Sequence, residues 1–129
     1  MTDQELIDAA LAVRKNAYCP YSGYRVGAAL VDDQGQMHIG CNVENAAYPQ
    51  GNCAEASAIG AMISAGGNTI VTIAVAGGRE AVKACTPCGG CRQRINEFAN
   101  EQTRVIVSSD DGGWDSYSMV ELLPASFHL

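Results

Sequence analysis

The fold class is indicated most clearly by residues 53–76, which read CAEASAIGAMISAGGNTIVTIAVA. The alanine-rich half, residues 53–65, predicts a buried helix that Asn52 caps and that Gly66 ends. The other half, residues 69–76, is a continuous run of β-branched and small apolar residues, which is typical of a strand covered on both faces. A buried helix that leads directly into a buried strand indicates an α/β protein.

The segments on either side continue this alternation. We expect a first helix that begins at a Thr2-x-x-Glu5 capping box and ends near Ala17, strands at 25–31 and 36–42, a loop at 43–52, a helix at 88–100 and a strand at 103–108. Residues 117–123 fit either a strand followed by a helix or a single helix. The first two strands would form an antiparallel hairpin, and the later crossovers would join parallel strands. The sequence therefore predicts a three-layer α-β-α sandwich around a mixed five-stranded sheet.

Length and composition favour a single globular domain over residues 1–129. Hydrophobic residues make up 47% of the chain and charged residues 17%, below the ~25% of an average globular protein. The low charged fraction hints that another subunit covers part of the surface. The formal net charge of −6 argues against a nucleic-acid partner, because contacts to phosphates require a basic surface.

We expect no targeting signal at the start of the chain. Residues 1–5 lack the basic and apolar regions of a signal peptide, and no apolar run approaches the ~20 residues of a membrane span. We therefore expect a cytoplasmic protein with no membrane partner. Its six cysteines would be reduced, and clustered thiols in that setting are metal ligands or catalysts more often than disulfides.

Two motifs place cysteines at predicted helix starts: Cys53-Ala54-Glu55 and Pro87-Cys88-Gly89-Gly90-Cys91. Zinc binds cysteine sulfur at about 2.3 Å in tetrahedral geometry. The free N–H groups and positive dipole of a helix start lower the pKa of a thiol and favour the thiolate ligand. Three protein ligands would leave the fourth position to water, as in catalytic zinc sites, and Glu55 is close enough in sequence to reach that water.

The same motifs resemble those of zinc-dependent nucleoside and base deaminases. The resemblance extends to Pro20-Tyr21-Ser22-x-Tyr24-x-Val26-Gly27-Ala28-Ala29-Leu30, to Asn42-Val43-Glu44-Asn45-Ala46 and to Leu122-Leu123-Pro124-x-x-Phe127. These segments, in this order, are similar to those of the small cytidine deaminases of the cytidine/deoxycytidylate deaminase superfamily. The similarity covers nearly the whole chain.

The resemblance implies a metal centre and a reaction. One Zn²⁺ per chain would be held by Cys53, Cys88 and Cys91. The enzyme would hydrolyse cytidine, and 2′-deoxycytidine, to the uridine product and ammonia. Zinc-bound hydroxide would attack the amine-bearing ring carbon, with Glu55 as the proton shuttle.

The resemblance also implies seven contacts to a nucleoside. They are Asn42 and Glu44 to the ribose hydroxyls, Tyr24 stacked on the pyrimidine, the backbone of Ala54 and the carbonyl of Thr86 at the base edge, and Tyr48 and Phe127 reaching the site of a neighbouring subunit. The last two follow from similarity to family members that are homotetramers with shared active sites.

One position departs from the pattern of many relatives, which carry arginine directly after the motif glutamate. Here that residue is Ala56. Three thiolates on one Zn²⁺ leave a net charge of −1, which makes a bound water less acidic. We expect the two helix N-termini to offset this charge, with Arg92 or Arg94 as the alternative source.

Other interpretations of the cysteines remain open. A blasticidin-type or other small-base deaminase would share both cysteine motifs, although Asn42 and Glu44 favour a ribose ligand. A purely structural zinc site could take Cys85 or Cys41 as a fourth ligand. An iron–sulfur site is disfavoured, because the run Cys85-x-x-Cys88-x-x-Cys91 lacks the fourth cysteine that ferredoxin spacing requires.

The remaining candidates have plainer interpretations. Cys19, Cys41 and Cys85 would otherwise be small buried hydrophobic residues. His38 is expected on the surface of a strand. Nucleic-acid editing is disfavoured by the acidic composition and by the lack of a basic groove.

Overall fold

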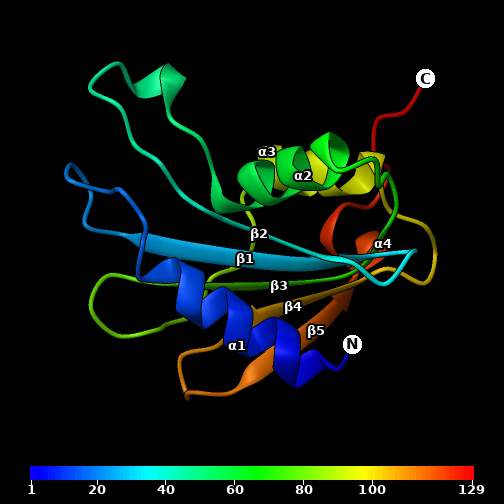
Figure 1. Ribbon diagram of the computed structural model, residues 1–129, viewed down its shortest axis with the longest axis horizontal. Helices are drawn as coiled ribbons and strands as arrows, with labels where there is room; N and C mark the ends of the chain where they lie inside the picture. The colour runs from blue at the N-terminus through cyan, green and yellow to red at the C-terminus, as the bar shows by residue number, and fades with distance from the viewer.

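A computed structural model describes residues 1–129 and places a five-stranded sheet at the centre of the molecule (Figure 1). The strands are β1 (Arg25–Asp32), β2 (Met37–Cys41), β3 (Ile70–Gly78), β4 (Arg104–Ser108) and β5 (Trp114–Ser118). The helices are α1 (Asp3–Arg14), α2 (Ala54–Ser64), α3 (Gly89–Glu97), α4 (Met119–Leu122) and a 3-10 turn, η1 (Tyr48–Gln50).

The sheet is mixed, with the strand order β2-β1-β3-β4-β5. Strand β1 is antiparallel to both β2 and β3, β3 is parallel to β4, and β5 is antiparallel to β4. Strands β2 and β3 therefore run in the same direction on either side of β1. The two crossovers, through α2 and through α3, join parallel strands as predicted.

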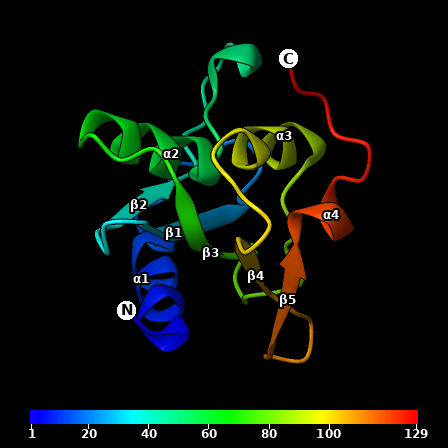
Figure 2. The same cartoon turned by 90° about the vertical axis from the view of Figure 1, so that its right-hand side faces the viewer.

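The helices cover both faces of the sheet. Helix α1 lies on one face, and α2 and α3 lie on the other (Figures 1 and 2). Side chains alternate between the two layers, as the pleat requires: Ala28 and Leu30 of β1 pack on the α2 and α3 side, whereas Ala29 and Val31 pack on the α1 side. The predicted three-layer sandwich is confirmed.

Small residues let α1 lie close to the sheet. A Cβ at Gly27 of β1 would collide with the carbonyl oxygen of Ala10. The β3 residues that face α1, Ala74 and Ala76, are also small and fully buried. This close contact brings Arg14, the last residue of α1, to the end of the sheet where β1 begins and β3 ends.

Helix boundaries differ from the predictions at several points. The Thr2–Glu5 capping box is present, but α1 ends at Arg14 rather than near Ala17. The prediction of Asn52 as the cap of α2 is wrong: the cap is Cys53, and the Asn52 side chain donates to Ser57 instead. Helix α3 covers 89–97 rather than 88–100, because its last turn is already unwound at Phe98.

The C-terminal region is a strand followed by a short helix, one of the two alternatives expected. Strand β5 begins at Trp114, earlier than expected. A second capping box, formed by Ser118 and Glu121, then starts α4. No helix of the protein is both long enough and apolar enough to span a bilayer.

The expectation that His38 lies on the surface is wrong. Its side chain is 8% exposed, and its Nε2 lies 2.8 Å from Oδ2 of Asp32 at the far end of β1. The other oxygen of Asp32 accepts backbone N–H groups from Gln34 and Gln36 in the hairpin turn. His38 and Gly40 lie on the buried side of β2, whereas Ile39 between them is exposed, and this register places the His38 ring beside the carboxylate.

Candidate metal centre and substrate pocket

Two helix starts meet on the same side of the sheet. Cys53 is the N-cap residue of α2, and Cys88 is the N-cap residue of α3. Neither side chain makes a capping hydrogen bond within the helix that follows it. Cys91 lies in the first turn of α3 and is fully buried. The start of α3 thus supplies two sulfurs and the start of α2 supplies one, and all three converge on a single point.

The three sulfur atoms of Cys53, Cys88 and Cys91 lie within 4.8 Å of one another. Tetrahedral zinc with Zn–S bonds of about 2.3 Å needs sulfurs roughly 3.8 Å apart. The group therefore fits a zinc ion with modest closure. Neither Cys41 nor Cys85 belongs to it, so the structure offers three ligands and not the four of a closed structural site.

Glu55 is the first acidic residue of α2 and is 5% exposed. Its carboxylate is not part of the ligand group but lines the same pocket as the three sulfurs. Burial raises the pKa of Glu55 above its usual value. A buried carboxyl with a raised pKa next to a metal site is suited to accept a proton and return it.

The thiols differ in their electrostatic environments. Backbone N–H groups at the start of α3, that of Cys91 foremost, lower the pKa of Cys88. Burial has the opposite effect on the other two and raises the pKa of Cys53 and of Cys91. The expected lowering of thiol pKa by helix starts is therefore found at Cys88 only, since desolvation is the larger effect elsewhere.

Two arginines follow Cys91 on α3 and serve different partners. Arg94 donates from Nη1 to the sulfur of Cys91 at 3.6 Å. Arg92 instead donates to the backbone carbonyls of Pro87, at 2.7 Å, and Leu122, at 2.9 Å. Arg92 thereby holds the Cys88 loop against α4, and only Arg94 reaches a sulfur.

An open pocket of about 520 Å³ lies above the sulfurs, a size usual for small-molecule sites. Six of the seven predicted nucleoside contacts line it: Tyr24, Asn42, Glu44, Tyr48, Ala54 and Thr86. It also has lining residues that sequence reasoning missed, among them Val26, Asn52, Ala84 and Cys85. The loop that precedes α3 contributes Ala84 to Thr86, and no pattern in the sequence indicates which of them face inward.

Asn42 connects the end of β2 to the start of β1. Its Oδ1 accepts the N–H of Val26 at 2.8 Å, and its Nδ2 donates to the carbonyl of Tyr24 at 2.8 Å. An amide has a second lone pair and a second N–H. Asn42 can therefore fix the backbone beside Tyr24 and still bind a hydroxyl in the pocket.

Glu44 holds the preceding loop. Its carboxylate accepts the backbone N–H groups of Tyr21, at 2.9 Å, and Ser22, at 3.1 Å, and the hydroxyl of Ser22. These bonds, with that of the Ser22 hydroxyl foremost, lower the pKa of Glu44. A carboxylate has about four acceptor positions, so one is left for a ligand.

Tyr24 and Cys85 form one wall of the pocket. Burial, and then a hydrogen bond with Cys85, raise the pKa of Tyr24 to about 12, so its hydroxyl remains a donor at neutral pH. A Cβ at Gly77 would collide with the Cys85 sulfur, which shows how closely this thiol packs on β3. The interpretation of Cys85 and Cys41 as buried hydrophobic residues is wrong, since both are partly exposed.

Tyr48 and Phe127 project outward from the chain. Tyr48 lies on η1, lines the rim of the pocket and is 76% exposed, with its ring edge against Tyr21. Phe127 does not line the pocket and is 69% exposed. Only its backbone carbonyl is held, by the side chain of Gln93.

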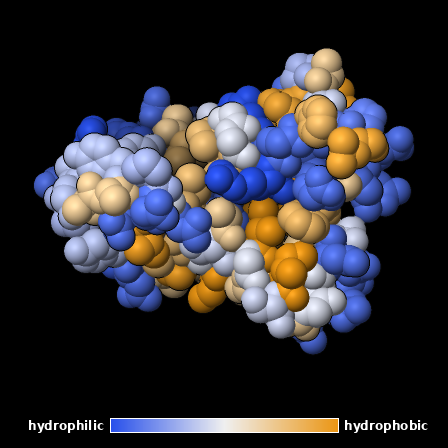
Figure 3. Space-filling view, turned by 90° about the horizontal axis from the view of Figure 1, so that it is seen from above, coloured by the Kyte–Doolittle hydropathy of each residue, from blue (hydrophilic) through white to orange (hydrophobic).

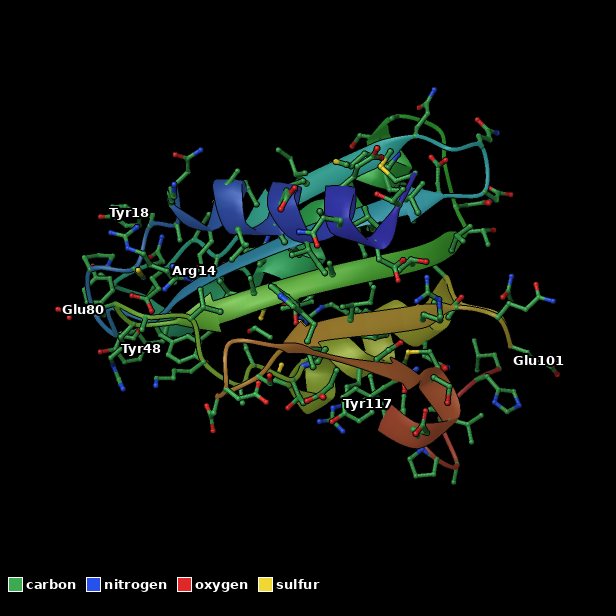
Figure 4. All side chains as sticks on the ribbon, turned by 90° about the horizontal axis from the view of Figure 1, so that it is seen from below. Arg14, Tyr18, Tyr48, Glu80, Glu101 and Tyr117 are labelled. Carbon is green, nitrogen blue, oxygen red and sulfur yellow. The ribbon has the colours of Figure 1, made fainter.

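Arg14 is a further positioning residue that the sequence did not reveal. Its guanidinium is buried and donates to the carbonyls of Gly78, at 2.8 Å, Arg79, at 3.1 Å, and Glu80, at 3.3 Å. Figure 4 shows Arg14, Glu80 and Tyr48 at the same end of the molecule. Arg14 thus anchors the start of the loop that leads to the pocket and to Cys88.

Comparison with known proteins agrees with this geometry. A family model described as the cytidine and deoxycytidylate deaminase zinc-binding region matches residues 1–109. A cytidine deaminase from Sporosarcina psychrophila is 38% identical over 127 residues, which are 98% of this chain and 92% of the relative.

Solved structures show the same fold. The cytidine deaminase of Burkholderia pseudomallei superposes with a TM-score of 0.89 at 41% identity, covering 98% of this chain and all of that chain. That of Mycobacterium tuberculosis superposes with a TM-score of 0.84 at 33% identity over the full length of both. The sequence match, the shared fold and the three-sulfur group together show that the chain belongs to the zinc-binding cytidine and deoxycytidylate deaminase family.

Proposed function

We propose that the protein catalyses the hydrolytic deamination of cytidine and 2′-deoxycytidine. Water would replace the ring amino group, giving uridine or deoxyuridine and ammonia. The observation that carries the proposal is the buried carboxylate of Glu55 beside three converging sulfurs in an open pocket. Zinc held by Cys53, Cys88 and Cys91 would lower the pKa of a bound water toward about 7.

Glu55 carries the proton transfers. Its carboxylate would accept a proton from the attacking water and deliver it to the pyrimidine ring nitrogen. It would then help to protonate the departing amine. The raised pKa that burial gives this group suits both directions of transfer.

The pocket walls orient the nucleoside. Asn42 and Glu44 each retain at least one polar position for a ribose hydroxyl beyond their bonds to the chain. Tyr24 would stack on the pyrimidine, while the backbone of Ala54 and the carbonyl of Thr86 would bind the base edge. Because a hydroxyl-binding pair of this kind can hold ribose or deoxyribose, we propose both as substrates.

The active assembly would be a homotetramer in which Tyr48 and Phe127 reach a neighbouring site. Both aromatic rings are exposed in the single chain. The surface on the side of α2 and α3 also carries apolar groups in several places (Figure 3). Contact with other subunits would cover such groups and complete the open side of the pocket.

The test is the ultraviolet absorbance of cytidine and of 2′-deoxycytidine incubated with purified protein of measured zinc content. Wild type should remove the cytidine band, and Glu55→Gln should be slower by about 10²–10⁴-fold, the usual contribution of a general acid–base. Glu101→Gln is the matched control, because Glu101 is exposed and lies at the opposite end of the molecule from Tyr48 (Figure 4).

Each outcome is informative. A zinc-loaded protein that leaves both nucleosides unchanged would refute the substrate, and blasticidin and free bases would be tried next. Equal rates for wild type and Glu55→Gln would refute the role of Glu55. A monomer in light scattering that retains full activity would remove the roles given to Tyr48 and Phe127.

A further inference from the structure

The proposed metal centre concentrates negative charge around two buried groups, the Cys91 sulfur and the Glu55 carboxylate. Three thiolates exceed the charge of one Zn²⁺ by one, and the carboxylate of Glu55 lies beside them. Uncompensated buried charge is costly and weakens the acidity of a metal-bound water. The residue after Glu55 is Ala56, which can supply no positive charge.

Arg94 lies one helical turn beyond Cys91, on the same face of α3. Its Nη1 approaches the Cys91 sulfur at 3.6 Å, a distance suited to a charge-assisted bond to sulfur. No carboxylate lies within ion-pair distance of Arg94, since the protein's two ion pairs involve other residues. The guanidinium is therefore directed at the metal centre alone.

Small neighbours create the space for this side chain. A Cβ at Gly90 would lie 3.3 Å from Nη1 of Arg94, so a larger residue there would push the guanidinium away. Ala56 and Gly60 of α2 line the same shallow groove as Arg94. The absence of a long side chain at Ala56 leaves this groove open to an arginine from α3.

We propose that Arg94 is a positioning residue of the metal centre, which offsets the excess negative charge through its bond to the Cys91 thiolate. The inference rests on the proposed zinc site and names the residue that balances its charge. It revises the expectation that helix N-termini alone suffice. The start of α3 supplies N–H groups to Cys88, whereas Cys91 receives the guanidinium. Arg92 is committed to two backbone carbonyls.

The test compares wild type with Arg94→Gln, with the double variant Ala56→Arg/Arg94→Gln and with Arg104→Gln. The last is a matched control, because Arg104 pairs with Asp3 on the opposite face of the sheet, which carries α1. Zinc affinity is measured by competition with a chromophoric chelator. Co²⁺-substituted protein reports the sulfur-to-metal absorption band, and the melting temperature of zinc-free protein reports the fold.

Arg94→Gln should lower zinc affinity about 10-fold, the low end for loss of a ligand's hydrogen-bonding partner, because Arg94 is exposed to solvent. It should shift the Co²⁺ band and lower kcat more than it changes KM, while zinc-free melting stays as in wild type. Ala56→Arg in the same chain should recover part of the affinity, because it places a guanidinium in the same groove.

The proposal would be overturned if Arg94→Gln bound zinc with an affinity within twofold of wild type and its Co²⁺ band did not shift. A lower melting temperature of the zinc-free variant, with no recovery by Ala56→Arg, would also overturn it and make Arg94 a structural residue. A wild-type protein that holds no zinc or leaves cytidine unchanged would instead refute the proposed function. The two failures are therefore distinguishable.

Discussion

Strand β1 connects two polar clusters, each with a buried carboxyl group, Asp32 in one and Glu55 in the other, that differ in where their partners lie. At its far end, Asp32 accepts two backbone N–H groups and the ring nitrogen of His38, so both carboxylate oxygens are satisfied within the chain. At its near end, β1 reaches the pocket where Glu55 and three sulfurs converge. There the polar groups face open space.

This difference in partners predicts which cluster determines stability and which determines function. A buried charge whose partners are internal fixes local structure, and its removal leaves donors or acceptors without partners. A buried charge that faces a pocket costs folding energy until a ligand arrives. The Asp32 cluster should therefore govern unfolding, and the cysteine cluster should govern metal binding and activity.

The largest effect is expected from Cys88→Ser. Removing one of three sulfurs should abolish stable zinc binding and reduce activity at least about a thousandfold, since a bound metal contributes several kcal/mol to catalysis. Metal analysis of the purified protein and the rate of cytidine loss measure both. Cys41→Ser is the control, because Cys41 lies outside the sulfur group. Stoichiometric zinc in Cys88→Ser would mean that the ligand set is wrong.

Asp32→Ala should have the opposite effect, lowering stability and leaving zinc binding and activity unchanged. It leaves the backbone N–H groups of Gln34 and Gln36 and the ring of His38 without their acceptor. We expect the free energy of unfolding to fall by about 3 kcal/mol, with zinc content and kcat/KM of the folded fraction unchanged. Urea unfolding and kinetics at low temperature check this. A matching loss of kcat/KM would show that the two ends of β1 are coupled.

The sequence predicted these clusters unequally. Cys53, Cys88 and Cys91 stood out because metal chemistry needs particular residue types at particular spacings. The sheet followed from the β-branched run at 69–76. The pairing of Asp32 with His38 did not, because a hydrogen bond across a hairpin depends on twist and register rather than on composition.

The hydrogen bonds of Arg14 to the loop after β3 also left no signal in the sequence. Its acceptors are backbone carbonyls, which every residue possesses, and three of them lie more than 60 positions away in sequence. The pocket residue Cys85 was assigned to the core for a related reason. Its exposure depends on how the loop before α3 passes over Gly77.

The pH dependence of stability should also distinguish the two clusters. The hydrogen bond from His38, followed by the N–H groups of Gln36 and Gln34, lowers the pKa of Asp32. A depressed folded-state pKa contributes stability that is present above the unfolded pKa, about 3.9, and is lost as pH falls through the folded value. Unfolding free energies from pH 6 downward should therefore fall more steeply in wild type than in Asp32→Asn. Parallel curves would contradict this assignment.

The smallest effect is expected from Arg14, and it discriminates best between the two clusters. The hydrogen-bond partners of Arg14 all lie within the chain, yet the residue lies at the pocket end of β1. Arg14→Lys keeps the charge but loses the pair of guanidinium donors, in which Nε reaches the carbonyl of Arg25 and Nη2 reaches those of Gly78, Arg79 and Glu80. We expect a loss of about 1–2 kcal/mol in unfolding free energy and a KM for cytidine a few-fold higher, since the loop carrying Thr86 starts there. Zinc content should not change. A lower unfolding free energy with an unchanged KM would show that the hydrogen bonds of Arg14 stabilise the fold without shaping the pocket. Groups whose partners lie within the chain would then govern stability alone, even at the end of β1 where the pocket lies.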